Sequence, residues 1–203
     1  MDLLEKCSIL YFHKKCIEEN GIGTFGSLGW EQETGQQKRF EVLAKIGNLN
    51  NSSIVDLGCG YGDLKLYLSQ HFDHFKYTGI DFMPEFIEEA KKKFANCPDT
   101  EFLRKDFSES DIPNADYIFA SGVFCYRSNE TAYYIDLIKK MVSHANKGIG
   151  FNMLNIATFP HNTFLKAHEL SSTITLCKSI GEKVVVTQNY LPDDFTIFVY
   201  TKH

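Results

Sequence analysis

The stretch SSIVDLGCGYGDL, residues 52–64, decides the fold of this 203-residue chain. Its residues Ile54, Val55 and Leu57 form a short apolar run, typical of a strand that is buried on both faces of a parallel sheet. Three glycines follow at alternate positions, namely Gly58, Gly60 and Gly62. An amphipathic segment then begins at Leu64. The order predicts a strand, a glycine-rich turn and a helix, which together can cradle a nucleotide-type ligand at the strand's carboxyl end. A tight turn without a ligand is the alternative.

The charged residues around the turn indicate the charge of that ligand. A dinucleotide fingerprint would read G-x-G-x-x-G and would place a pyrophosphate on the helix start, where no carboxylate is wanted. Here the third glycine comes one residue early, Asp63 stands in its place, and Asp56 precedes the loop. Two acids favour a ligand with a positive group near the glycines. S-adenosylmethionine (SAM), which carries an ammonium and a sulfonium, meets that description.

Length and composition limit the classes of protein that the chain can represent. A chain of 203 residues with 43% hydrophobic and 23% charged residues is expected to form one globular domain, residues 1–203. Its net charge of −5 argues against a dedicated nucleic-acid binder. The six cysteines form no C-x-x-C pair and no zinc spacing, so no metal site is predicted. Scattered cysteines, the charged N-terminus and the lack of a long apolar run predict a cytoplasmic protein outside the membrane.

The first 35 residues are expected to cap a site. Helical spacing of apolar residues predicts a helix over residues 3–19, and a second is expected over 36–46, with Arg39 near its start. Between them lies GIGTFGSLGW, residues 21–30, whose glycines and aromatic side chains suggest a lid that closes over a ligand. The alternative is a surface connection in which Trp30, the only tryptophan, packs on the core.

Polar residues recur where the following strands end. Asp81 follows a strand expected over 76–80 and is placed to accept hydrogen bonds from two ribose hydroxyls, although a helix N-cap is the plain alternative. Asp106 and Phe107 follow a strand over 100–104, and Ser121 ends a strand over 116–121. The remaining expected helices cover 63–72, 84–94, 129–145 and about 161–170. The remaining expected strands cover 148–155, 183–190 and 195–200, the last two as a hairpin.

These elements, taken in order, resemble class I SAM-dependent methyltransferases over roughly residues 36–203. The resemblance implies a Rossmann-like α/β fold: a mostly parallel seven-stranded sheet, helices on both faces and a C-terminal antiparallel hairpin. It also implies the cofactor SAM, with S-adenosylhomocysteine as product. The residues that it assigns to cofactor binding are Asp56, Gly58, Cys59, Gly60, Asp81, Phe82, Met83, Asp106, Phe107, Ser121, Trp30 and Arg39.

The roles that the resemblance implies differ along the cofactor. Asp56 and the backbone of residues 58–60 would hold the methionine portion. Asp81 would bind the ribose, with Phe82 or Met83 over one face of the adenine. Asp106 and Phe107 would read the adenine, and carbonyls near Ser121 would receive the ammonium. Trp30 and Arg39 would cap the site, where Arg39 could pair with the ligand's carboxylate or, alternatively, lie in solvent as a surface charge.

Methyl transfer needs an aligned nucleophile and, for a hydroxyl or ring nitrogen, a base. Four side chains are candidate bases, each with a packed or exposed side chain as the alternative: Tyr11, His13, Tyr126 and His161. Residues 121–126, SGVFCY, lack the Asn/Asp-Pro-Pro-aromatic motif of enzymes that methylate exocyclic amines of bases. We therefore expect a small-molecule acceptor, methylated at N, O or C, and a monomer or homodimer.

Three other functions compete with this one. The chain could be a SAM-binding regulator or partner subunit without turnover. A nicotinamide-dependent dehydrogenase is disfavoured by Asp63 and the early third glycine. An aminopropyltransferase would use a similar fold, but its families carry further glycines and acids at the first loop, which this chain lacks.

Overall fold

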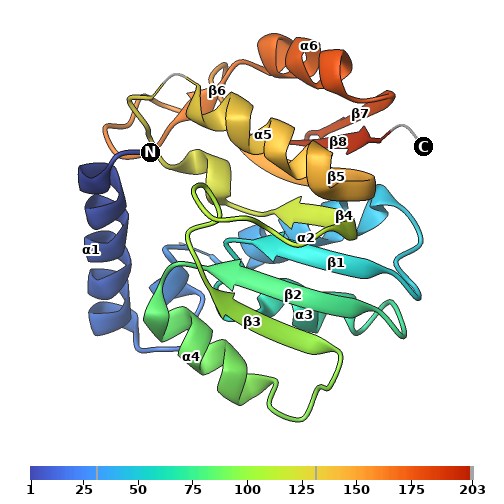
Figure 1. The fold of residues 1–203 in the computed structure, drawn as a ribbon. Coiled ribbons are helices and arrows are strands. Elements are labelled where there is room, and N and C mark those ends of the chain that lie inside the picture. The colour runs from blue at the N-terminus through green and yellow to red at the C-terminus, as the bar shows by residue number, and fades with distance from the viewer. Residues whose placement is uncertain (31, 131, 202–203) are drawn as a thin grey trace.

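Strand β1 (Ser53–Leu57) lies inside the sheet, hydrogen-bonded in parallel to β2 on one side and to β4 on the other (Figure 1). The computed structural model describes residues 1–30, 32–130 and 132–201. Within them eight strands form one sheet in the order β3-β2-β1-β4-β5-β8-β7, with short β6 paired to β5. The other strands are β2 (Lys76–Asp81), β3 (Thr100–Arg104), β4 (Ala115–Ala120), β5 (Ala145–Asn155), β6 (Ala167–His168), β7 (Lys183–Gln188) and β8 (Asp194–Tyr200).

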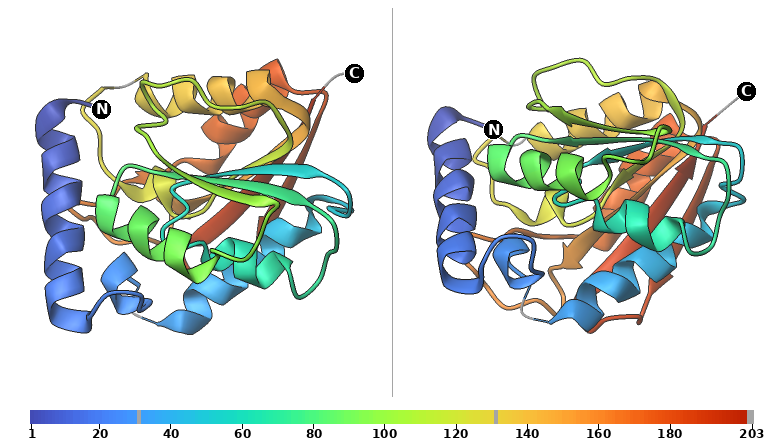
Figure 2. Two further views of the ribbon diagram at one scale, coloured as in Figure 1. Left: turned by 60° about the horizontal axis from the view of Figure 1, so that its bottom comes forward. Right: turned by 90° about the horizontal axis from the view of Figure 1, so that it is seen from below.

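Helices α2 to α6 cover both faces of this sheet, and α1 lies at its edge (Figure 1). The described α-helices are α1 (Leu3–Asn20), α2 (Glu33–Leu43), α3 (Asp63–Leu68), α4 (Pro84–Lys93), α5 (Tyr133–His144) and α6 (Leu170–Ile180). Because successive side chains of a strand point to opposite faces, Ile54 packs with α2, α3 and α4, whereas Val55 and Leu57 pack with α5 and α6. Figure 2 shows these two helix layers on opposite sides of the strands.

The C-terminal hairpin ends the sheet as predicted. Strand β8 is antiparallel to both β5 and β7, while the pairs β3–β2, β2–β1, β1–β4 and β4–β5 are parallel. The mostly parallel Rossmann-like sheet with an antiparallel end is therefore confirmed. The short β6 is a strand beyond the seven that were expected.

Helix α4 shows how local sequence produces these elements. Pro84 occupies the first helical turn, where its missing N–H leaves nothing unsatisfied. Phe86, Ile87 and Ala90 recur at helical spacing and are buried, Ile87 and Ala90 against the sheet and Phe86 in a smaller cluster with Tyr61 and Met83. Three lysines in the last turn complement the negative end of the helix dipole.

The prediction of a helix around residues 161–170 is wrong, because α6 begins only at Leu170. The preceding backbone is used in other bonds: the side-chain oxygen of Asn162 accepts from the N–H groups of Phe164 and Leu165. The guanidinium of Arg127 donates to the carbonyls of Asn162 and Leu165. The backbone of the segment pairs with the turn after β4 instead of with itself: the N–H of Arg127 donates to the carbonyl of Phe164, and the N–H of Lys166 donates to the carbonyl of Cys125.

Other boundaries move by less. Helix α3 ends at Leu68 rather than at residue 72, α2 begins at Glu33 and passes into a 3-10 turn over Ala44–Ile46, and β5 begins at Ala145. The helix expected over 129–145 is observed as Tyr133–His144. Residues 31, 131 and 202–203 lie outside the described residues. They belong to the expected cap, to the helix expected over 129–145 and to the end of the expected single domain.

Helix α1 stands across the carboxyl ends of the strands (Figure 1). Asp2 caps it by accepting from the N–H of Glu5, and the Glu5 carboxylate accepts from the N–H of Asp2 in return. Only Ile9 and His13 of its 18 residues are buried. A 3-10 turn at Gly26–Leu28 continues the chain over the same edge of the sheet. The N-terminal segment therefore covers the end of the sheet where the predicted site residues gather. No helix among the described residues is long and apolar enough to cross a membrane.

Candidate active site

A cavity of about 1030 Å³ opens at the carboxyl edge of the sheet, between the strand ends and the N-terminal segment. This volume is at the upper end of the roughly 300–1,000 Å³ of small-molecule sites. The twelve residues that the sequence assigned to cofactor binding all line it: Trp30, Arg39, Asp56, Gly58, Cys59, Gly60, Asp81, Phe82, Met83, Asp106, Phe107 and Ser121. The fold thus brings together residues from four strand ends and from the cap.

The glycine loop needs glycine at its first position. Gly58 has φ +70°, which L side chains rarely adopt, and a Cβ there would lie 2.5 Å from Cγ2 of Val123. The N–H of Gly58 donates to the carbonyl of Ile80 on the neighbouring strand at 2.8 Å. The backbone of the loop is therefore held close to the cavity, with no side chain in between.

Asp81 is fixed by the backbone at the end of β2. One carboxylate oxygen accepts from the N–H of Gly60 at 3.0 Å, and the other accepts from the N–H of Met83 at 2.9 Å. Burial raises the pKa of Asp81 to about 6, and these hydrogen bonds oppose the rise. Each oxygen keeps a lone pair, so the carboxylate can still accept hydrogen bonds from a ligand's hydroxyl groups.

Asp56 is buried at the glycine loop and lacks one hydrogen-bond partner. One oxygen accepts from the hydroxyl of Tyr77 at 2.5 Å, and the other, Oδ1, has no hydrogen-bond partner. Burial raises the pKa of Asp56 to about 7, and the neighbouring carboxylates of Asp81 and Asp63 add to the rise. A cationic group in the cavity would supply the missing donor and favour the ionised carboxylate. The unpartnered acceptor therefore fits a ligand that carries an ammonium group, and its charge also suits a nearby sulfonium.

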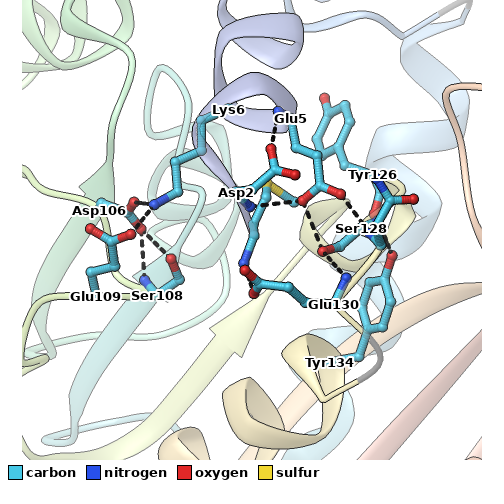
Figure 3. A network of polar contacts seen from close by, with 12 residues as sticks. Asp2, Glu5, Lys6, Asp106, Ser108, Glu109, Tyr126, Ser128, Glu130 and Tyr134 are labelled. Carbon is cyan, nitrogen blue, oxygen red and sulfur yellow. Dashed lines mark hydrogen bonds and ion pairs between the residues drawn. The ribbon is translucent and has the colours of Figure 1, made fainter.

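Asp106 is already engaged by the cap (Figure 3). Its Oδ1 accepts from the N–H and the hydroxyl of Ser108, and its Oδ2 lies 2.8 Å from Nζ of Lys6 on α1. Burial opposes ionisation of Asp106, but the hydrogen bonds from Lys6 and Ser108 prevail and lower its pKa. Lys6 also pairs with Glu109. The acid that the resemblance assigns to the adenine thus also ties α1 to the loop after β3.

The N-terminal part of α1 is tied down by further polar contacts. Glu5 accepts from the hydroxyl of Ser128 at 2.9 Å and from the N–H of Asn129 at 2.5 Å, and Figure 3 shows these bonds beside the Lys6 cluster. The hydroxyl of Tyr134 donates to the carbonyl of Tyr126, which orders the same loop. The cap is therefore attached to the rim of the cavity through hydrogen bonds and ion pairs.

Arg39 is buried, so the alternative of a solvated surface charge is wrong. Its guanidinium donates two hydrogen bonds to the carboxylate of Asp194, one of them from Nη2 at 2.8 Å. The guanidinium carbon lies 4.3 Å from the ring centre of Trp30. Arg39 thus joins α2, the cap and the first residue of β8, and its charge is compensated within the protein.

The four candidate bases separate into two pairs. His13 and Tyr126 both line the cavity, with Nε2 of His13 2.7 Å from the Tyr126 hydroxyl. Tyr11 is 63% exposed on α1, His161 is exposed in the loop before β6, and neither lines the cavity. Burial lowers the pKa of His13 to about 4, and the backbone of Ser27 opposes the shift. The imidazole is therefore neutral at pH 7.

Three further cavity residues were not identified from the sequence. Asn152 on β5 accepts from the N–H of Gly122 at 2.9 Å and so fixes the turn after Ser121. A lone amide within an apolar strand was the available signal. Asp194 falls in the expected hairpin connection and Lys6 in the expected first helix, and their partners are too distant in the sequence to be recognised by spacing. Among the described residues, no three His, Cys, Asp or Glu side chains could hold a metal ion.

The central part of the chain matches a known protein family. Residues 55–150 match the model of the methyltransferase domain. The chain is 36% identical over 107 residues to a Mycobacterium tuberculosis protein named as a methyltransferase, covering 50% of this chain and 63% of that protein. It is 30% identical over 110 residues to trans-aconitate 2-methyltransferase of Escherichia coli, covering 51% of this chain and 40% of the enzyme. The chain thus spans less than two thirds of the curated relatives that it matches.

Comparison with solved structures extends over nearly the whole chain. Magnesium protoporphyrin IX methyltransferase from Synechocystis PCC 6803, solved with bound SAH, superposes with a TM-score of 0.71 at 17% identity, covering 98% of this chain and 100% of that one. N-methyltransferase NodS from Bradyrhizobium japonicum WM9, in complex with SAH, gives 0.70 at 17% identity, covering 95% and 100%. At these identities the likeness establishes the fold.

Proposed function

We propose that the chain, whose residues 55–150 match the methyltransferase domain model, is a class I, SAM-dependent methyltransferase that transfers a methyl group from SAM to a small-molecule acceptor. Sequence relatives and structural neighbours with this fold act on acceptors as different as trans-aconitate and magnesium protoporphyrin IX, so they do not select one. We propose that the chain works as one domain, a monomer or homodimer, with residues 1–35 as the cap. Six unpaired cysteines support a cytoplasmic setting.

The single observation that carries the proposal is the unpartnered oxygen of Asp56 beside the glycine loop. A buried carboxylate oxygen without a donor is costly, and a cationic ligand would relieve that cost. Asp56, Asp81 and the backbone of residues 58–60 line one continuous wall of the cavity. This wall would bind the positive methionine portion at one end and the ribose hydroxyls at the other.

The remaining assignments follow the same wall. Phe82 and Met83 would cover the adenine, and Asp106 with Phe107 would contact its edge. Ser121 lies at the opposite end, in the turn that Asn152 fixes. Trp30 and Arg39 would close the cavity from the cap, and because Arg39 is already paired with Asp194 we assign it to holding Trp30 in place. Bound SAM supplies a methyl group activated by the sulfonium, and the protein's part is to align the acceptor and receive its proton.

Thermal unfolding with and without S-adenosylhomocysteine tests the proposal. A ligand at about a hundred times its Kd adds about 2.7 kcal/mol, which for a domain of this size raises the Tm by roughly 5–10 °C. We expect this rise in the wild type and in the exposed-acid control Asp99→Asn, and its loss in Asp56→Ala. Equal Tm values with and without ligand in the wild type would contradict SAM binding. Binding without release of S-adenosylhomocysteine across a broad acceptor panel would instead favour a non-catalytic SAM-binding protein.

A further inference from the structure

One part of the cavity is lined by aromatic side chains from three segments. Phe12 and His13 come from α1, Tyr126 from the turn after β4, and Phe164 from the loop before β6. Their rings pack edge to face or tilted: Phe12 with Phe164 at 4.9 Å between centroids, and Tyr126 with Phe164 at 5.5 Å. Phe25, which is 41% exposed, lines the same cavity from the cap. A partly exposed aromatic wall in a concave site is suited to a flat apolar ligand.

Charge limits which flat ligands can enter. Of the described lysine and arginine side chains, two line the cavity, and both are paired: Lys6 with Asp106 and Glu109, and Arg39 with Asp194. Burial keeps the imidazole of His13 neutral by lowering its pKa to about 4. A carboxylate ligand would therefore lose its hydration without gaining a free cation in return, which is unfavourable.

The aromatic wall has one polar feature that can exchange a proton. The Tyr126 hydroxyl and Nε2 of His13 lie 2.7 Å apart, and Nδ1 of His13 has no hydrogen-bond partner. Burial raises the pKa of Tyr126, so the phenol keeps its proton at pH 7. When the ring proton is on Nδ1, the Tyr126 hydroxyl donates to Nε2. Its oxygen is then free to accept a hydrogen bond from a ligand.

On the basis of the proposed methyl transfer, we infer that the acceptor is an uncharged aromatic hydroxyl compound whose hydroxyl group binds Tyr126, with His13 as the final proton acceptor. The aromatic wall selects the ring, the paired cations disfavour an acid, and the Tyr126–His13 pair receives the hydroxyl proton. The inference names the acceptor class and goes beyond binding of SAM.

Methyl transfer forms one bond and breaks one. The acceptor oxygen attacks the methyl carbon, so an O–CH₃ bond forms as the S–CH₃ bond breaks and its electron pair returns to sulfur. The acceptor's proton passes to the Tyr126 oxygen, and the tyrosine proton passes to Nε2 of His13. The products are the methyl ether, uncharged sulfur in S-adenosylhomocysteine, and an imidazolium that afterwards loses its proton to solvent.

A matched pair of probes tests the acceptor class directly. We would titrate 2-naphthol and 2-naphthoate into the protein by isothermal titration calorimetry at pH 7.5, with and without saturating S-adenosylhomocysteine. We expect 2-naphthol to bind at least tenfold more tightly. Equal affinities, preference for the carboxylate, or no binding of either probe would overturn the inference. Binding of S-adenosylhomocysteine is measured separately. If the protein does not bind S-adenosylhomocysteine, the proposed function is overturned. If it binds S-adenosylhomocysteine but shows the wrong probe preference, only the acceptor class is overturned.

Two aspartate variants test the charge argument. Asp194→Asn removes the partner of Arg39 and should strengthen 2-naphthoate binding by at least fivefold, while 2-naphthol changes by less than twofold. Asp193→Asn removes the same charge from the neighbouring lining residue, whose side chain makes no ion pair in the described structure, and should leave the preference unchanged. Equal effects of the two variants would contradict the argument. Circular dichroism checks that both variants are folded, and the wild-type preference decides the inference if Asp194→Asn is not.

The proton route has its own test, release of S-adenosylhomocysteine with 2-naphthol as acceptor. We expect Tyr126→Phe and His13→Gln to lower kcat by at least a hundredfold, with the affinity for S-adenosylhomocysteine unchanged within twofold. The wild-type kcat should be constant above pH 6 and fall in acid as His13 becomes protonated. Tyr11→Phe, on the exposed face of α1, is the control and should match the wild type. Unchanged kcat in Tyr126→Phe would overturn the proton route.

Discussion

A carboxylate oxygen of Asp81 accepts a hydrogen bond of 3.0 Å from the backbone N–H of Gly60, so the acid that ends β2 holds the glycine loop that follows β1. Its second oxygen accepts from Met83, at the start of α4. Asp81 therefore both shapes the loop and offers lone pairs to a ligand. The N-cap of α4 is Met83 and not Asp81, so the N-cap alternative for Asp81 is wrong, and the carboxylate keeps lone pairs for the proposed ribose role.

Asp81→Ala should weaken the fold before any ligand is added. It leaves two N–H groups without their acceptor, and the free energy of unfolding should fall by about 1–3 kcal/mol. Urea unfolding of the ligand-free protein measures the change. Asp99→Ala removes an exposed acid and should change the same quantity by less than about 0.5 kcal/mol. A loss of ligand affinity in Asp81→Ala with no loss of stability would contradict the loop-shaping role.

Asp56 should give the ligand-free protein an unusual pH dependence. The folded-state pKa of about 7 lies above the ordinary value of 3.8, so the folded state binds more protons than the unfolded state between these values. The stabilisation from Asp56 is therefore present below about pH 4 and is lost as pH rises through about 7. Asp81, with its pKa of about 6, contributes in the same direction. Urea unfolding from pH 4.5 to 8 should show a smaller decline in Asp56→Asn, and parallel curves would count against this assignment.

The same titration should affect ligand affinity in the opposite sense. A cationic ligand interacts with the ionised form of Asp56, so S-adenosylhomocysteine, which retains the ammonium, should bind more tightly as pH rises from 6 to 8. Calorimetry at fixed ionic strength measures this. The pH dependence of the affinity should be weaker in Asp56→Asn. A wild-type affinity that falls from pH 6 to 8 would contradict the role of Asp56 in binding the ammonium.

Two glycines provide a matched comparison. Gly58→Ala forces a side chain into a left-handed backbone conformation, at about 1–2 kcal/mol, and brings its Cβ to 2.5 Å from Val123. Both stability and S-adenosylhomocysteine affinity should fall. Gly35→Ala adds a methyl group in α2 where no atom lies within 4 Å, and it should stabilise the protein by about 0.5–1 kcal/mol. Thermal unfolding measures the stability of both variants. A Gly58→Ala variant as stable as the wild type would contradict the prediction.

The buried pair of Arg39 and Asp194 should be costly to break from either side. Arg39→Met leaves a carboxylate buried without its partner, and the free energy of unfolding should fall by about 3–5 kcal/mol. The double variant Arg39→Met with Asp194→Leu should lose less than the sum of the single variants. Lys38→Met removes an exposed partner of Glu41 and should cost at most about 1 kcal/mol. Additive losses in urea unfolding would show that the two residues are not coupled.

Short-range patterns in the sequence were sufficient for the sheet and for one wall of the cavity. Asp56 lies near the end of the first strand, Asp81 ends the second and Asp106 comes two residues after the third, and parallel strands bring their carboxyl ends to one edge. The pattern of glycines and acids thus predicted which residues would meet, without any information on distant contacts. Their placement along the cavity follows from strand order, and their roles toward a ligand remain proposals.

Long-range pairs could not be predicted in this way. Arg39 and Asp194 are 155 positions apart, and His13 and Tyr126 are 113 apart. Each member alone is an ordinary polar residue on a helix or in a loop, and only packing shows that the two meet. The helix α6 was misplaced for a related reason: Asn162 and Arg127 hold the preceding backbone, while serines and threonines between Leu170 and Ile180 obscure the helical pattern.

The way α1 is attached has a consequence for the timing of catalysis. The helix is secured by ion pairs such as that between Lys6 and Asp106, and its Leu10 and Ile17 pack on a small cluster outside the two cores of the sheet, so its release from the cavity rim would break these contacts and leave the sheet intact. Spent cofactor leaving the cavity would pass this helix, so opening of α1 would set the rate of product release, a step separate from bond formation. The ion pairs among these contacts weaken in salt. Added salt would then speed product release, up to the concentration at which the ligands themselves bind too weakly.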